Sequence, residues 1–234
     1  MDFQVACLKA AKASFIERIR SHSFLGRCRR GEVCLGELKL YLVQQGIYGQ
    51  YFTRYLCAMM ANLPSNEAVM TLAENLFEEL GLVPNRPKPH HLIYREMLER
   101  YSLALDGTQG LPGTRHLIET MFNHCRNLNP AYGLGALCLG AESLVPAIYG
   151  DIIAGFMAQG AHARDVEFFQ LHVGCDDGHA EALRDIMVEI ASREPEQIGR
   201  MLQAGRELVA ARLEFFSSIE AAYSQRAQDE LTTV

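Results

Sequence analysis

The chain has 234 residues, of which 49% are apolar, and a net charge of −6. This length and apolar content suffice for one sizeable core, so we expect a single domain over residues 1–234, frayed at its C-terminus from about residue 226. The basic residues cluster at one place, RCRR at 27–30. So short a cluster is typical of a solvated loop, and we expect no nucleic-acid partner.

The first twenty residues and the cysteines indicate the compartment. MDFQVACLKAAKASFIERIR carries charges every few positions and lacks the apolar core of a signal peptide. The seven cysteines form no CxxC pair, which is typical of reduced thiols rather than of a disulfide framework. We therefore expect a cytoplasmic protein.

Helical periodicity dominates the chain, and strand alternation is almost absent. Periodicity and end signals predict helices over residues 2–20, 36–62, 66–80, about 90–105, 112–126, 130–160, 164–191 and 195–225. Ser65 is a predicted N-cap and Gly81 a predicted stop for the third of these helices. The sequence thus predicts an all-α protein, a bundle of about seven to eight helices.

Residues 127–162 carry only two charged side chains, Glu142 and Asp151, and their hydropathy would suit a membrane span. An ionised carboxylate at the centre of such a span is costly, so we favour a buried helix and expect no membrane partner. A buried Glu142 needs a partner, since an isolated carboxylate would protonate. That partner is a metal ion, an arginine or a buried water.

The stretch HVGCDDGH at 172–179 places metal-ligating residue types on one helix face. His172, Asp176 and His179 follow an i, i+4, i+7 spacing and fall within a fan of about 60°. Apolar residues continue that side of the helix. Gly174 and Gly178 weaken a helix and keep a loop-like alternative open. We favour a helix whose inward face carries metal ligands.

Two further helical segments each place one possible metal ligand on their inward face. In SNEAVMTLAENLFEELG, Glu79 continues the apolar face of Leu72, whereas Glu78 is rotated by about 100° toward the surface. In HHLIYREMLERY, His90 shares its face with apolar residues and His91 is the more exposed histidine.

The inward groups are three carboxylates and three imidazoles: Glu79, His90, Glu142, His172, Asp176 and His179. This set suits two iron or manganese ions with open positions for oxygen or substrate. Zinc hydrolases would show HExxH or cysteine-rich spacing, and a ferritin-like bundle would show two Glu-x-x-His motifs. The chain shows none of these patterns.

Four blocks in order resemble those of the heme-oxygenase-like di-iron oxidases and oxygenases, which share the fold of TenA and PqqC. ENLFEELG resembles N-L-x-[DE]-E, and the histidine at 90 follows it in a pattern like H-x-x-L-[WY]. LCLGAESLVPAIY resembles Y-E-S-x-[IV]-P, and FFQLHVGCDDGHAEAL resembles F-x-x-H-x-x-x-D-x-x-H-A. The resemblance covers nearly the whole chain, and its metal ligands are the same six residues.

The resemblance implies two Fe(II) ions per chain and O2 as co-substrate. It implies oxidation of a small metabolite, by N-oxygenation, C–C cleavage or oxidative decarboxylation, through a peroxo-diferric intermediate. We prefer an amino-acid-derived substrate, because the early core helix is polar where a fatty acyl tunnel would be apolar. Arg54 and Arg95 are candidate cations for a substrate carboxylate. The candidate substrate-binding residues are Gln44, Gln45, Tyr48, Phe52 and Tyr55.

Two alternatives belong to other classes of protein. One is a metal-independent enzyme of the TenA/PqqC-like fold, with chemistry at Cys125 or Cys138. The other is a non-catalytic helical binding protein whose histidines and aspartates are buried polar groups. A small-molecule ligand is expected in each case, and a homodimer is left open.

Overall fold

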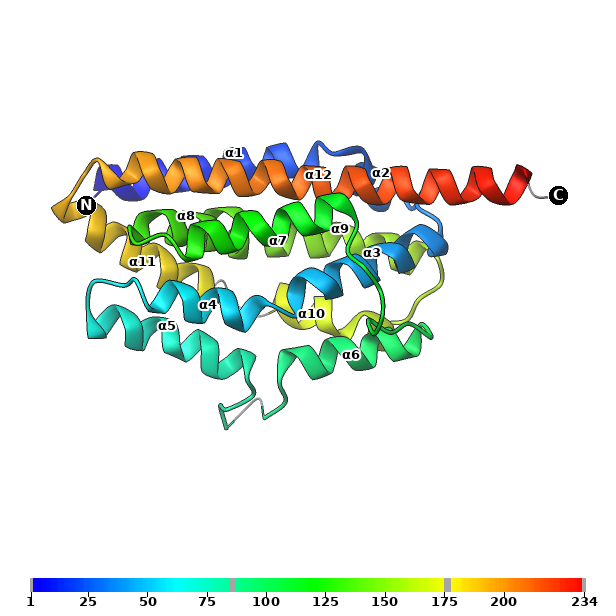
Figure 1. Cartoon of the computed structure of the whole chain (residues 1–234), viewed down its shortest axis with the longest axis horizontal. Coiled ribbons are helices and arrows are strands. Elements are labelled where there is room, and N and C mark those ends of the chain that lie inside the picture. The colour runs from blue at the N-terminus through cyan, green and yellow to red at the C-terminus, as the bar shows by residue number, and fades with distance from the viewer. Residues whose placement is uncertain (1, 85–86, 175–177, 233–234) are drawn as a thin grey trace.

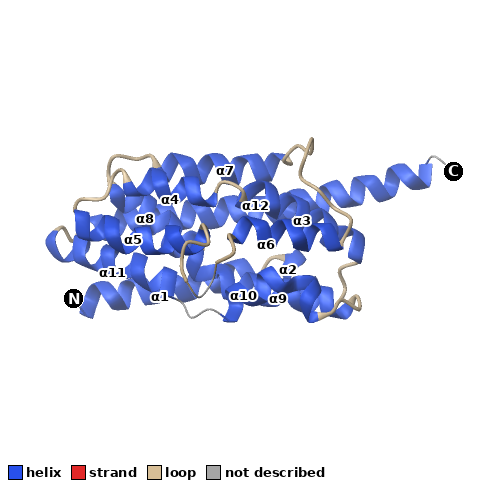
Figure 2. Ribbon diagram, turned by 90° about the horizontal axis from the view of Figure 1, so that it is seen from below, coloured by secondary structure: helices blue, strands red, loops and turns tan. Residues whose placement is uncertain are grey.

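The computed structural model describes residues 2–84, 87–174 and 178–232, and its regular elements there are helices (Figure 1). Figure 2 shows the same helices from below, joined by short loops. The all-α fold class predicted from the sequence is confirmed. The elements are α1 (Asp2–Arg20), α2 (Ser23–Arg29), α3 (Leu35–Gly49), α4 (Phe52–Met60), α5 (Asn66–Glu79), α6 (His90–Arg100), α7 (Pro112–Cys125), α8 (Pro130–Gly140), the 3₁₀ helix η1 (Glu142–Leu144), α9 (Val145–Ala158), the 3₁₀ helix η2 (Ala163–Val166), α10 (Glu167–Gly174), α11 (Gly178–Arg193) and α12 (Gln197–Thr232).

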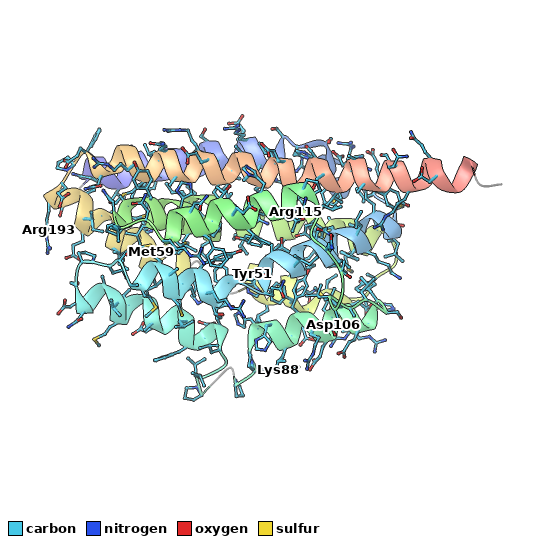
Figure 3. The ribbon with its side chains drawn as sticks, viewed as in Figure 1. Tyr51, Met59, Lys88, Asp106, Arg115 and Arg193 are labelled. Carbon is cyan, nitrogen blue, oxygen red and sulfur yellow. The ribbon has the colours of Figure 1, made fainter. Side chains whose placement is uncertain are left out.

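The helices outnumber the predicted seven or eight, because three predicted helices are divided. The 36–62 helix breaks into α3 and α4 at Tyr51, whose backbone has φ −96° and ψ −1° and which lies at their junction in Figure 3. The 130–160 helix breaks at Ala141, with φ −128° and ψ −81°. Pro146 then starts α9, where its missing N–H costs no helical bond. In the 164–191 segment the 3₁₀ helix η2 precedes α10, and α11 begins after residues 175–177, which lie outside the described part of the chain.

Helix ends follow local chemistry, and the ends of α6 and α12 differ from prediction. Ser65 caps α5 by accepting a hydrogen bond from the Ala68 N–H at 3.2 Å, as predicted. The short helix α2 was not predicted. Helix α6 ends at Arg100 rather than near 105, because Ser102 adopts φ +57°. Helix α12 continues to Thr232, beyond the predicted fraying, since QRAQDELT is rich in strong helix formers.

The long helix α12 is the central packing element of the bundle. It runs along the top of Figure 1 beside α1 and packs chiefly on α8 and α7. Helices α4, α5 and α6 lie on the opposite side of the molecule in that view. An aromatic cluster holds α2, α3 and α12 together, with Phe24 and Tyr41 against Phe216.

Residues Pro130–Ala158 are long and apolar enough to cross a membrane by length and composition. In this fold 67% of the most apolar window is buried inside the protein, and the chain breaks at Ala141. Its two carboxylates differ in their surroundings. Asp151 pairs with Arg20 at 3.0 Å and with Arg29 at 2.6 Å, whereas no arginine or lysine forms an ion pair with Glu142 in the described part of the chain.

Candidate metal centre

The last residue of α5 and the first residue of α6 meet inside the protein. Glu79 Oε1 lies 3.0 Å from His90 Nδ1, and both side chains are buried. Gly81 lets the chain turn here, since it adopts φ +68° and a Cβ would strike the backbone at Pro89. Lys88 and Asp106, labelled in Figure 3, mark the loops before and after α6. The turn therefore places a carboxylate and an imidazole together at the end of one helix and the start of the next.

His172 of α10 completes a triad with these two residues. One ligand atom from each of Glu79, His90 and His172 lies within 4.8 Å of the others, which is a spacing that one metal ion can span. His172 Nδ1 lies 2.7 Å from the Phe168 carbonyl oxygen. An Nδ1–H that donates to this carbonyl leaves the Nε2 lone pair free for a metal.

Burial keeps the His172 imidazole neutral. It lowers the pKa of His172 to about 4, with His90 lowering it further and the charge of Glu79 opposing the change. A neutral imidazole is the form that binds a metal. Imidazole nitrogens with a carboxylate oxygen are ligands that suit iron, so the triad fits the metal that the sequence predicts.

Glu142 lies in η1, directly after the break at Ala141, and borders the same cavity as the triad. Burial raises the pKa of Glu142 to about 7, while His179 lowers it and Glu79 raises it. The carboxyl group is thus close enough to interact electrostatically with both the triad and the histidine of α11. A divalent cation would favour its ionised form.

His179 of α11 contacts a residue that was predicted to face solvent. Its Nε2 lies 3.0 Å from Glu78 Oε2, and these two side chains are 23% and 22% exposed. Glu78 is therefore partly buried against α11 rather than on an open surface, because α11 packs against α5. The remaining predicted ligand, Asp176, lies outside the described residues.

A cavity of about 580 Å³ opens from the triad between α3, α6, α9, α10 and α12. Three of the candidate substrate-binding residues line it: Gln45, Tyr48 and Phe52. The structure does not bring Gln44 or Tyr55 to the cavity wall. Gln44 Oε1 accepts hydrogen bonds from the Leu111 N–H and the Thr114 hydroxyl, and the Tyr55 ring packs on Phe122.

Arg212 of α12 and Tyr149 of α9 also line the cavity and were not predicted. The signal for Arg212 is present in the sequence, because it follows Leu208 by four residues and precedes Phe216 by four. It is thus a charged residue on an apolar face.

The two candidate cysteines of the metal-independent alternative lie apart from the cavity. Burial raises the pKa of the Cys125 and Cys138 thiols to about 12. The Cys138 thiol donates to the Ala180 carbonyl oxygen at 3.4 Å. Neither thiol borders the cavity, which argues against either as its nucleophile.

Solved structures share this arrangement of helices over nearly their whole length. A domain of unknown function with a heme oxygenase-like fold from Shewanella denitrificans has a TM-score of 0.78 at 16% identity, covering 94% of this chain and 93% of that one. A TenA homologue from Pseudomonas syringae has a TM-score of 0.76 at 14% identity, covering 94% and 92%. A CADD-like protein of unknown function from Nostoc punctiforme has a TM-score of 0.74 at 17% identity, covering 91% and 96%.

Because the sequence identities are low, the likeness to these solved structures shows the fold alone, which is the heme-oxygenase-like fold. The sequence model of a family described as "iron-containing redox enzyme" matches residues 39–213, and the chain belongs to this family. A search of curated protein sequences finds no match. The resemblance predicted from the four sequence blocks is confirmed for the family and the fold.

Proposed function

We propose that the protein is a non-heme di-iron enzyme that uses O2 to oxidise a small, amino-acid-derived metabolite. The observation that carries the proposal is the triad of Glu79, His90 and His172, whose ligand atoms lie within 4.8 Å of one another beside a cavity of about 580 Å³. Membership of an iron-containing redox family supports the choice of iron.

The proposed ligands fall into two groups. Glu79, His90 and His172 would hold one ion. His179 would hold the other with Asp176, and Glu142 lies within electrostatic reach of both groups. When bound, two ferrous ions would supply two electrons to O2 within reach of the substrate.

The protein's own residues would prepare this chemistry in three ways. The Phe168 carbonyl oxygen orients the His172 ring, and Glu78 can orient His179 from the other side. The rings of Phe168 and Tyr149 pack on His172 at centroid distances of 4.2 and 5.9 Å, and so limit access of water to it. The cavity gives a small substrate access to the triad.

The test of the proposal measures the reaction of the ferrous protein with O2. The full-length protein is loaded with Fe(II) without oxygen, mixed with O2, and followed by oxygen consumption and visible absorption, alone and with amino acids. We expect O2 uptake and a transient or lasting colour in the wild type and in His116→Ala, which alters an exposed histidine of α7. Both signals should be lost in His172→Ala.

The metal-independent alternative predicts a different result in the same experiment. Oxygen uptake would be no faster than that of free Fe(II), and His172→Ala would behave like the wild type. That outcome would overturn the di-iron proposal and favour chemistry like that of the putative TenA-like thiaminase from Sulfolobus solfataricus, whose structure has a TM-score of 0.66.

A further inference from the structure

Arg212 places a positive charge inside the cavity that also borders the triad. The side chain is 5% exposed and projects from α12, the long helix along the top of Figure 1. Its Nη1 donates to Gln45 Oε1 at 3.0 Å. Its guanidinium lies over the Tyr48 ring, with Cζ 4.3 Å from the ring centroid. Both neighbours also line the cavity.

This cation is not neutralised by any carboxylate in the described part of the chain. Its Nε is buried and has no hydrogen-bond acceptor there, and no ion pair to the guanidinium occurs among those residues. Elsewhere the fold does pair buried charges, as Asp151 with Arg20 and Arg29 shows. A buried, unpaired charge lowers the stability of the fold. An anion bound in the cavity beside Arg212 would neutralise this charge.

The Tyr48 hydroxyl is a second unsatisfied donor on the same cavity. Tyr48 is 3% exposed, and its hydroxyl donates to no acceptor in the part of the chain that the structure describes. Burial raises the pKa of Tyr48 to about 12, against the opposing charge of Arg212. The hydroxyl therefore keeps its proton and can donate it to an anion.

Gln45 holds the guanidinium in place without neutralising it. Its Oε1 accepts from Arg212, and its Nε2 donates to Tyr149 Oη at 3.2 Å. A neutral amide can orient an arginine but leaves its charge for a ligand. Gln45 is therefore a positioning residue for Arg212.

We propose that Arg212 and Tyr48 form an anion site that binds the carboxylate of a small substrate. The proposal deepens the proposed function and rests on it, because the same cavity then holds the oxidisable end of the substrate near the triad. A carboxylate suits the planar fork of arginine. One cation and one hydroxyl match its single negative charge better than the double charge of a phosphate. Leu98, Val145, Ile148 and Phe168 line the cavity for the apolar body of the ligand.

Arg54 and Arg95, the cations that the sequence suggested for this role, lie at exposed positions of the cavity rim. Arg54 stacks over Tyr51, and Arg95 pairs with Glu99 at 3.7 Å. Their charges are solvated or already paired, so neither requires an anion inside the cavity. The buried position of Arg212 distinguishes it from both.

The test compares carboxylates with their neutral amides on the full-length, metal-free protein, where no metal can hold the ligand. Benzoate and benzamide, octanoate and octanamide, and inorganic phosphate are titrated by calorimetry. Wild type is compared with Arg212→Met, Arg212→Lys and Tyr48→Phe. Arg206→Met is the matched control, because Arg206 lies on the exposed face of the same helix. Circular dichroism and thermal unfolding check that each variant is folded.

We expect the wild type to bind at least one carboxylate more tightly than its amide, by about 10- to 100-fold. Arg212→Met should abolish this preference, Arg212→Lys should restore part of it, and Tyr48→Phe should reduce it by a smaller factor. Arg206→Met should leave it unchanged. Loss of stability alone, with the preference intact, would show that Arg212 has only a structural role.

Three results would overturn the proposal: no carboxylate binding by the wild type at millimolar concentration, equal binding of acid and amide, or an unchanged preference in folded Arg212 variants. Tighter binding of phosphate than of either carboxylate would overturn the choice of ligand. If Arg212→Met does not fold, Arg212→Lys and Tyr48→Phe decide the question. His172→Ala should keep the carboxylate preference while losing iron, so failure of the anion site and failure of the di-iron proposal remain distinguishable.

Discussion

At the scale of residues, Glu142 and His172 make opposite contributions to the pH dependence expected of the proposed metal site. The pKa of Glu142 is raised to about 7, mainly by burial, so a metal must displace a proton from it below that pH. The pKa of His172 is lowered to about 4, mainly by burial, so His172 is already neutral. We predict that proton release from Glu142 by itself makes Fe(II) affinity rise by up to about tenfold per pH unit from pH 5 to 7, and that this contribution then levels off. Anaerobic titrations at several pH values check this.

The control for that prediction is Glu142→Gln, which removes this titrating group and should make the pH dependence less steep as well as weaken binding. The metal-free fold should respond in the opposite sense at Glu142. Its raised pKa means that the native state holds more protons than the unfolded chain between pH 4.5 and about 7, so this group lowers stability as pH rises through that window. An affinity independent of pH below 7 would contradict the assignment of Glu142 as a ligand.

Glu78 carries a second prediction at this scale, because it contacts His179 at 3.0 Å. A carboxylate that orients a ligating histidine contributes to metal affinity. We predict that Glu78→Gln weakens binding of one iron by about 10- to 100-fold and leaves the other unchanged. Glu74→Gln, at an exposed position on the same helix, is the matched control. Equal behaviour of the two variants in an iron titration would refute the role of Glu78.

The inward direction of Glu79 and His90 could be predicted from the sequence, because each shares a helix face with apolar residues. The contact of Glu78 could not, since it depends on α11 packing against α5. A single helix pattern gives the direction of a side chain but not the neighbour that meets it. Arg212 is a different case: its place on an apolar helix face is visible in the sequence, but the cavity that it lines is set by the tertiary fold.

At the scale of elements, the close approach of α8 and α12 depends on glycine. A methyl group at Gly135 would meet the backbone carbonyl of Met201. We predict that Gly135→Ala lowers the free energy of unfolding by about 1–3 kcal/mol. Gly150→Ala, within α9 and with nothing near the added methyl, should raise it by about 0.5–1 kcal/mol. Chemical denaturation measures both, and equal effects would contradict the close approach.

The breaks within the long helices could not be predicted from the sequence. The sequence predicts continuous helices over 36–62 and 130–160, whereas the structure turns at Tyr51 and Ala141. Helix α8 is apolar on nearly all sides, so it has no periodic pattern that the break at Ala141 would interrupt. The break at Ala141 places Glu142 at the start of η1, and this position beside the cavity is set by the tertiary fold.

At the scale of the whole molecule, the C-terminal part of α12 projects beyond the bundle in both ribbon views (Figure 1, Figure 2). Residues 224–229 are exposed, so they bury little apolar surface. We predict that removing residues 226–234 changes the free energy of unfolding by less than about 1 kcal/mol. A larger loss would contradict this, and a fall in molar mass by light scattering would show that the projection supports a homodimer.

The central claim concerns how many irons one chain holds, and an anaerobic Fe(II) titration of the full-length protein tests it most directly. We predict two irons per chain in the wild type and in His116→Ala, and fewer in both His172→Ala and His179→Ala, because each variant removes a ligand from a different group. One iron or none in the wild type, or an unchanged count in the two ligand variants, would contradict the di-iron account.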